Sequence, residues 1–212
     1  MDASFWRQRW ENNEIAFHQS EANPLLAKHF KELSLAKGSR IFLPLCGKTL
    51  DIGWLLSNGY RVAGAELSEI AVQQLFMDLV VEPKISVVGH MHHYSAENID
   101  IFVGDIFNVT GEMLGPVDAI YDRAALVALP EEMRNRYAPH LMEITGKAPQ
   151  LLICYEYDQS LTDGPPFSIS DAEVRRQYDR DYELSLIESA DVSGGLRGKF
   201  PAKEKVWLLQ RK

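Results

Sequence analysis

Residues 40–68, RIFLPLCGKTLDIGWLLSNGYRVAGAELS, contain the pattern that decides the fold. Residues 40–45 form an apolar run that predicts a buried strand, and residues 61–67 predict a second one. Between them, Gly47 permits a tight turn, and residues 50–56 have the apolar content of a short buried helix. A strand, a helix and a strand in this order predict a right-handed crossover that leaves the two strands parallel.

The same alternation of strands and helices continues along the rest of the sequence. Helices are predicted over residues 69–81, after Pro130 and from Asp171, with Ser68 and Asp171 as N-caps. The last two predicted strands have no helix-length segment between them, which indicates an antiparallel C-terminal edge. We therefore expect an α/β, Rossmann-like fold in one domain over residues 1–212, with a mostly parallel seven-stranded sheet and helices on both faces. The five strands predicted after the first two are residues 99–103, 117–122, 151–155, 182–187 and 205–210.

Composition and charge argue against several classes of function. The 212 residues suit one domain, and the net charge of −8 argues against a nucleic-acid partner, which needs a basic stripe. No apolar stretch is long enough to cross a membrane, and the polar N-terminal sequence MDASFWRQRWENNE has no signal-peptide core. Cys46 and Cys154 fit no metal or redox spacing. We therefore expect a cytoplasmic protein that binds neither nucleic acid nor membrane, and we also expect it to be a monomer.

Acidic residues end two predicted strands on the side of the Gly47 turn. Glu66 ends the second strand about 20 residues after the turn, where an acid accepts hydrogen bonds from ribose hydroxyls. Asp105 ends the third strand, near the expected adenine ring, although each acid alone is also compatible with a solvated strand end or a helix cap. Together the acids favour adenosine binding. The turn has one glycine and no basic clamp for a 2′-phosphate, so S-adenosylmethionine fits better than a dinucleotide.

The aromatic residues near the N-terminus have two interpretations. Trp6, Trp10 and Phe17 lie near helical spacing, which is typical of an amphipathic helix packed on a sheet. An aromatic segment ahead of the first strand is also well placed to fold over a pocket and exclude water. We expect residues 1–30 to form a helical lid of this kind.

Two other features suggest chemistry but have simpler explanations. His90, His92 and His93 are spaced closely enough for a metal cluster, but no second set of ligands accompanies them, so we expect a polar loop and no metal. Cys46 follows the first strand at the expected cofactor turn, where a cysteine could be a nucleophile, but a small residue is also needed there. We interpret Cys46 as a small turn residue.

Five stretches of the sequence resemble the thiopurine S-methyltransferase family, in order and with compatible spacing, and the short N-terminus resembles the bacterial branch. The resemblance extends from about Phe5 to the last strand. PLCGK and the DRxALVA block are the most distinctive stretches. The five stretches are Phe5-Trp6 with Trp10 and Ala16-Phe17-His18-Gln19, Pro44-Leu45-Cys46-Gly47-Lys48, Gly64-Ala65-Glu66-Leu67-Ser68-Glu69, Asp122-Arg123-Ala124-Ala125-Leu126-Val127-Ala128, and Gly164-Pro165-Pro166-Phe167.

The resemblance implies a class I methyltransferase that transfers a methyl group from S-adenosylmethionine to aromatic and heterocyclic thiols, thiopurines such as 6-mercaptopurine among them. Arg123 would be the catalytic residue: its guanidinium cannot act as a base, but it can favour a thiolate or order a water that takes the proton. The loop over residues 191–200 offers Arg197 and Lys199 as a second basic contact to the substrate. The implied cofactor residues are Trp10, Leu45, Glu66, Asp105, Ile106 and Arg123, and the implied substrate residues are Phe17, Pro44, Arg123 and Arg197.

Alternative functions remain open on the sequence. A methyltransferase of the same fold could act on oxygen, on nitrogen, or on selenium and tellurium compounds, with which bacterial members of the family are also linked. A non-catalytic adenosine-binding module would bind the cofactor and never release S-adenosylhomocysteine.

Overall fold

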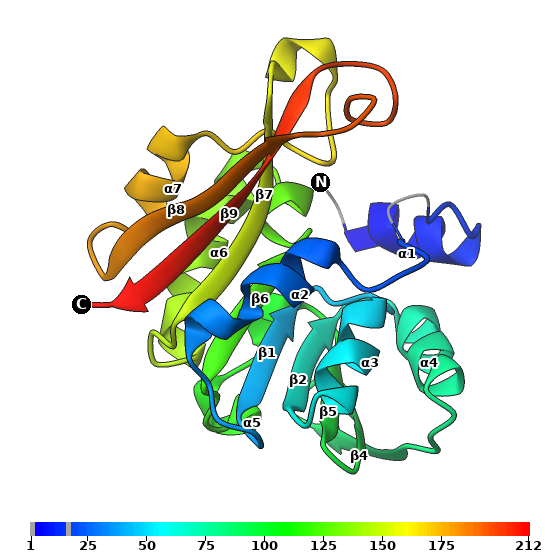
Figure 1. Ribbon diagram of the computed structural model, residues 1–212. Coiled ribbons are helices and arrows are strands. Elements are labelled where there is room, and N and C mark those ends of the chain that lie inside the picture. The colour runs from blue at the N-terminus through cyan, green and yellow to red at the C-terminus, as the bar shows by residue number, and fades with distance from the viewer. Residues whose placement is uncertain (1–2, 16–17) are drawn as a thin grey trace. The chain divides into compact units, whose positions relative to one another are not determined.

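The computed structural model describes residues 3–15 and 18–212, and the chain divides into two compact units, Met1–Ala119 and Ile120–Lys212 (Figure 1). We call them unit 1 and unit 2. Unit 1 contains the helices α1 Ala3–Glu11, α2 Pro24–His29, α3 Leu50–Ser57, α4 Glu69–Asp78 and α5 Gly111–Leu114, the 3-10 turns η1 Phe30–Leu33 and η2 Ile106–Asn108, and the strands β1 Arg40–Pro44, β2 Arg61–Glu66, β3 Lys84–Val88, β4 Met91–Ala96 and β5 Ile99–Val103.

The sheet of unit 1 has the order β3-β4-β5-β2-β1. Strands β1, β2 and β5 are parallel neighbours, with Pro44 opposite Ala65 and Glu66 opposite Val103. This confirms the predicted βαβ crossover. Because the carboxyl ends of parallel strands meet at one edge of a sheet, the loops after these three strands lie together there.

Gly64 shows why a glycine occupies the middle of β2. A Cβ at this position would lie 2.7 Å from Ile101 Cδ1 and 2.9 Å from Cys46 Sγ, which is closer than real contacts allow. The missing side chain lets β5 and the turn after β1 approach β2.

Strands β3 and β4 form an antiparallel hairpin that pairs with β5 and was not predicted. The prediction of a polar loop around His92 and His93 is therefore wrong. Their side chains are on the outer part of the sheet, where polar residues are tolerated, and this composition hid the strand from a pattern that depends on apolar residues. The described residues thus include two strands beyond the seven predicted.

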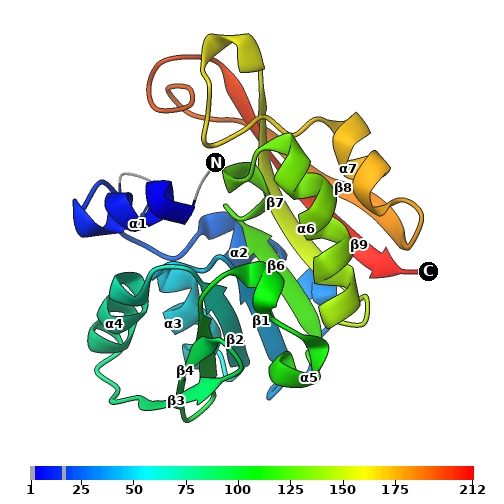
Figure 2. The same ribbon diagram turned by 180° about the vertical axis from the view of Figure 1, so that it is seen from behind.

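Unit 2 has the strand order β6-β7-β9-β8. Strands β6 and β7 are parallel, whereas β7–β9 and β9–β8 are antiparallel, which confirms the predicted C-terminal edge. Helices α6 and α7 lie on one face of this sheet (Figure 2). The elements are β6 Ala119–Arg123, η3 Leu126–Ala128, α6 Glu131–Ile144, β7 Gln150–Tyr157, η4 Gln159–Leu161, α7 Asp171–Tyr178, β8 Tyr182–Asp191 and β9 Ala202–Arg211.

The helix starts test the predicted caps. Ser68 caps α4, since its hydroxyl accepts the Ala71 N–H, as predicted. The N-cap of α7 is Ser170, whose hydroxyl accepts the Glu173 N–H, and Asp171 is the first helical residue, so that cap was predicted one residue late. Asp171 still places a negative charge near the positive end of the helix.

Candidate active site

The turn after β1 has a constrained backbone. Leu45 and Gly47 adopt φ angles of +48° and +53°, in the left-handed region that disfavours residues with a Cβ. The Gly47 N–H donates a hydrogen bond of 2.8 Å to Glu66 Oε2. The predicted cofactor turn and the acid that ends β2 are therefore directly connected.

Glu66 is 6% exposed and holds two segments of backbone with its two oxygens. While Oε2 accepts from Gly47, Oε1 accepts the Ser68 N–H at 2.8 Å. Burial raises the pKa of Glu66, and hydrogen bonds from the backbone of Ser68, Gly47 and Leu67 oppose that rise. Glu66 thus fixes the geometry of the edge of the sheet on which a ribose would rest.

Trp10 brings α1 onto the same turn. Its side chain is 5% exposed, and Cζ2 of its ring lies 3.0 Å from the point where a Cβ on Gly47 would stand. Beside it, burial and then the charge of Glu66 raise the pKa of the Cys46 thiol well above its usual value. A thiol that remains protonated is a poor nucleophile, which supports the interpretation of Cys46 as a small turn residue.

A cleft of about 310 Å³ lies beside this edge of unit 1. Residues 67–70, which directly follow Glu66, form one wall, Val103 and Gly104 at the end of β5 form another, and Arg7 and Glu11 of α1 also line it. His90 and His92 complete the lining, and the cleft opens after β2 and β5, at the edge where open α/β sheets bind ligands.

Asp105 and Ile106 follow directly after this wall of the cleft. The N–H of the preceding Gly104 donates a hydrogen bond of 2.9 Å to the backbone oxygen of Glu66. This hydrogen bond fixes the loop beside β2. Asp105 is exposed and its carboxylate accepts the Phe107 N–H at 3.0 Å, whereas Ile106 is buried. Unit 1 therefore brings Trp10, Leu45, Glu66, Asp105 and Ile106 to one edge of the sheet.

In unit 2, a buried carboxylate holds the loop that contains Arg123. Asp122 is fully buried and accepts hydrogen bonds from the Tyr137 hydroxyl at 2.7 Å and the Leu126 N–H at 3.1 Å. Its burial raises its pKa to about 6. Ala124 has a φ of +69°, an unfavourable conformation that these contacts maintain.

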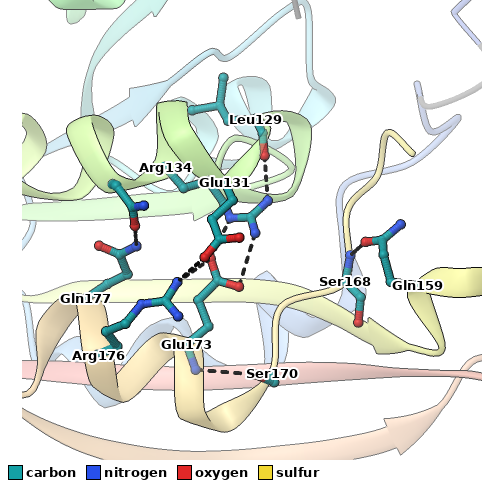
Figure 3. Close-up of polar contacts among 10 residues, drawn as sticks. Leu129, Glu131, Arg134, Gln159, Ser168, Ser170, Glu173, Arg176 and Gln177 are labelled. Atoms are coloured by element: carbon teal, nitrogen blue, oxygen red, sulfur yellow. Dashed lines mark hydrogen bonds and ion pairs between the residues drawn. The ribbon is translucent and has the colours of Figure 1, made fainter. Parts of the chain in front are cut away.

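An ion pair holds the far end of the same loop (Figure 3). The Arg134 guanidinium binds Glu173 of α7 with two hydrogen bonds, of 2.5 and 3.1 Å, and donates a third of 2.7 Å to the carbonyl of Leu129. Both charged side chains are almost fully buried. The carbonyl of Leu129, at the end of the loop, is therefore held to α6 by Arg134, which is itself bound to α7 through Glu173.

Arg123 lies on the sheet face opposite to α6 and α7, with two further polar side chains. The strand register places Arg123 beside Ile153, and Tyr155 opposite Glu204. The pKa of Tyr155 is raised to about 12, chiefly by burial and then by the charge of Glu204, while Arg123 lowers it. Burial also raises the pKa of Glu204, which Arg123 and a hydrogen bond with Tyr155 lower.

Arg197 is placed against the GPPF segment, residues 164–167. Its guanidinium donates a hydrogen bond to the carbonyl of Pro165. The Tyr157 hydroxyl donates another, of 2.5 Å, to the carbonyl of Pro166. Lys199 is exposed. Pro44 is buried at the end of β1, and Phe17 lies outside the described residues.

The histidines of the β3–β4 hairpin have separate partners. His92 Nδ1 lies 2.9 Å from Glu69 Oε1, while His93 contacts Asp100 at 3.0 Å and stacks on Phe102. Within residues 3–15 and 18–212, no group of three or more His, Cys, Asp or Glu side chains is placed to hold a metal ion. The same described ranges contain no helix both long and apolar enough to span a membrane.

Solved structures share the fold of this chain. The match with a Burkholderia thailandensis 1,6-didemethyltoxoflavin-N1-methyltransferase covers 98% of this chain and 87% of that enzyme's chain, with a TM-score of 0.67 at 12% sequence identity. The match with a Synechocystis magnesium protoporphyrin IX methyltransferase with bound S-adenosylhomocysteine covers 99% of this chain and 100% of that enzyme's chain, with a TM-score of 0.64 at 14% sequence identity. The fold is that of the class I methyltransferases, and the protein is an S-adenosylmethionine-dependent methyltransferase.

Sequence relatives define the family within this class. Residues 1–212 match the thiopurine S-methyltransferase family. Thiopurine S-methyltransferases of Xanthobacter autotrophicus and Teredinibacter turnerae are each 55% identical to this chain, cover all of it, and are covered over 100% and 98% of their own lengths. The chain belongs to the thiopurine S-methyltransferase family.

Proposed function

We propose that the enzyme methylates the sulfur atom of small aromatic and heterocyclic thiols, with thiopurines such as 6-mercaptopurine among its acceptors. The observation that carries this proposal is the family match over residues 1–212, with relatives of full length named for this activity. The arrangement of Glu66 and of Arg123, each at the carboxyl end of a strand, supports it.

We assign the cofactor to residues at the edge of unit 1. Glu66 would hold the ribose hydroxyls, Asp105 and Ile106 would border the adenine, and Trp10 and Leu45 would shape the turn beneath the cofactor. When bound, S-adenosylmethionine supplies an activated methyl group on a sulfonium sulfur. The protein then needs mainly to orient the acceptor, exclude water and manage one proton.

Arg123 is the residue to which we assign electrostatic support of the thiolate, with a further contact to the cofactor. Its charge is permanent, since the guanidinium does not deprotonate at physiological pH. Asp122 and Tyr137 fix the loop around it, so the charge is held in place before the substrate binds. We assign Phe17, Pro44 and Arg197 to the substrate side of the site.

A substrate panel tests the proposed function. Wild-type protein with labelled S-adenosylmethionine is offered aromatic thiols, thiopurines, catechols, amines, selenite and tellurite. We expect methylated product from the thiols at the highest kcat/KM. Faster turnover of a catechol, an amine or a selenium or tellurium compound, with none for any thiol, would contradict the proposal.

Arg123 is tested by acceptor acidity at saturating cofactor. Arg123→Ala should reduce turnover roughly 10- to 1000-fold, the range for removing one preorganised donor, and weakly acidic thiols should lose more than ionised ones. Arg123→Lys should recover part of the loss, since it retains the charge without the planar donors. Equal losses for all acceptors, restored by more cofactor, would limit Arg123 to cofactor binding.

We further propose that the enzyme works as a cytoplasmic monomer, one functional domain over residues 1–212 with residues 1–30 as its lid. The two cysteines, which are buried and unpaired, are consistent with a reducing compartment. The contact of Trp10 with the Gly47 turn supports a lid that reaches the cofactor.

A further inference from the structure

The three polar side chains on the unit 2 sheet face opposite to α6 and α7 come from three adjacent strands. Arg123 ends β6, Tyr155 lies near the end of β7, and Glu204 lies near the start of β9. Tyr155 and Glu204 are direct cross-strand partners, and Arg123 lies beside Ile153, two residues before Tyr155. Side chains two residues apart on a strand share a face, so the three form one cluster.

Glu204 has unused hydrogen-bonding capacity in this cluster. Its Oε1 is buried and has no hydrogen-bond partner among residues 3–15 and 18–212. Burial raises its pKa, the charge of Arg123 and the hydrogen bond with Tyr155 lower it, and the charge of Glu188 on β8 raises it again. A buried carboxylate oxygen without a donor is costly for a fold unless a ligand supplies one.

We propose that Glu204 is the proton acceptor for the thiol that the enzyme methylates, an inference that rests on the proposed function. The thiol S–H bond breaks, its electron pair stays on the sulfur, and the proton forms an O–H bond at Glu204 Oε1. The thiolate is then the nucleophile for the methyl group, and the neutral carboxylic acid of Glu204 returns its proton to water after the product leaves.

The other two members of the cluster cannot take this proton. The guanidinium of Arg123 is already fully protonated. Tyr155, with its pKa raised to about 12, keeps its hydroxyl proton near neutral pH and acts as a donor. Arg123 instead supplies the positive charge that stabilises the thiolate, and Tyr155 orients the Glu204 carboxylate.

Turnover of two acceptors provides the first test. Benzyl thiol is weakly acidic and must lose its proton in the site, whereas 4-nitrothiophenol is ionised at neutral pH. Glu204→Gln should slow benzyl thiol methylation about 100-fold, the scale of general base catalysis, and leave 4-nitrothiophenol unchanged or faster. Glu183→Gln, which removes an exposed carboxylate from β8, is the matched control and should affect neither.

A second readout does not depend on turnover: binding of the 4-nitrothiophenolate anion to the cofactor-free protein, followed by absorbance. In the wild type, the bound thiolate and the Glu204 carboxylate would be two negative charges beside the single positive charge of Arg123, so Glu204 must take up a proton when the thiolate binds. The affinity for the thiolate should therefore fall about tenfold per pH unit above the pKa of Glu204. In Glu204→Gln the affinity should be higher and independent of pH. Arg123→Ala should instead weaken thiolate binding at every pH.

A second variant keeps the proposal testable if Glu204→Gln does not fold. Tyr155→Phe removes a hydrogen bond that lowers the pKa of Glu204, so the rising limb of the pH–rate profile for benzyl thiol should move to higher pH. Identical profiles, or identical pH dependence of thiolate binding in wild type and Glu204→Gln, would overturn the role of Glu204. If the wild type methylates no thiol, the proposed function fails, while the binding comparison still decides whether Glu204 couples to a thiolate.

Discussion

Asp122 gives a quantitative prediction because its carboxyl is completely buried, and it can be replaced by a side chain of the same shape. Asp122→Asn removes the ionisable group and keeps an oxygen that can accept the N–H of Leu126. The new amide group would face the Tyr137 oxygen, which can accept a hydrogen bond from it. The variant should therefore fold with its loop intact.

The size of the effect follows from the pKa of Asp122. Burial raises that pKa from its ordinary 3.8 to about 6, so the folded protein binds the proton more tightly than the unfolded chain. As pH rises through this range, the wild type loses stability. At about 1.4 kcal/mol per pKa unit, the full loss is about 3 kcal/mol, of which about 2 kcal/mol falls between about pH 4.5 and pH 7.5.

Urea unfolding at several pH values measures this loss. All other titrating groups are shared, so they cancel when the free energy of unfolding of Asp122→Asn is subtracted from that of the wild type. The wild type should lose about 2 kcal/mol relative to the variant as pH rises from about 4.5 to about 7.5. Parallel curves for the two proteins over this range would refute a raised pKa at Asp122. Tyr137→Phe removes a donor to the carboxylate and should enlarge the loss.

Three further predictions concern unit 1. Glu66→Gln should weaken S-adenosylhomocysteine binding by about 1–3 kcal/mol, since its amide cannot accept both backbone N–H groups, and an unchanged affinity by calorimetry in a folded variant would remove Glu66 from the site. Deleting residues 1–18 should leave a folded core by circular dichroism with much reduced turnover, and full activity would reduce the segment to a packing role. Gly64→Ala should lower the free energy of unfolding by about 1–3 kcal/mol because its Cβ has no space, whereas Gly53→Ala, where the nearest atom is 3.7 Å away, should be neutral or stabilising in thermal melts.

The strands made of buried apolar residues could be predicted from the sequence, and so could the acidic residues at their ends. The β1–α3–β2 unit and its turn have a clear pattern of apolar runs broken by glycine, and this pattern placed Glu66 at the end of β2. The apolar run of β5 likewise placed Asp105 just after that strand. Strand β4 was missed because MHHYSA has two adjacent histidines and no regular alternation of polar and apolar residues, so it lacks the pattern that indicates a strand.

The grouping of the proposed proton acceptor with its two neighbours could not be predicted from the sequence. Arg123, Tyr155 and Glu204 are separated by tens of residues, and only the antiparallel register of β7 and β9 places the last two opposite each other. Register depends on backbone pairing between distant segments, which a single sequence does not display. The role of Asp122 was hidden for a related reason, since its partner Tyr137 lies on another element.

The buried pair of Arg134 and Glu173 has a consequence for how this family can vary. Loss of either partner alone would leave an isolated charge in the interior, at a cost of about 3–5 kcal/mol, whereas joint replacement by apolar residues of matching volume is often neutral. If the ionic pair is replaced by an apolar pair through one substitution at a time, the intermediate with a single substitution is unstable, whichever position changes first. Positions 134 and 173 should therefore be inherited together, and a lineage that changed one of them would be expected to have changed the other.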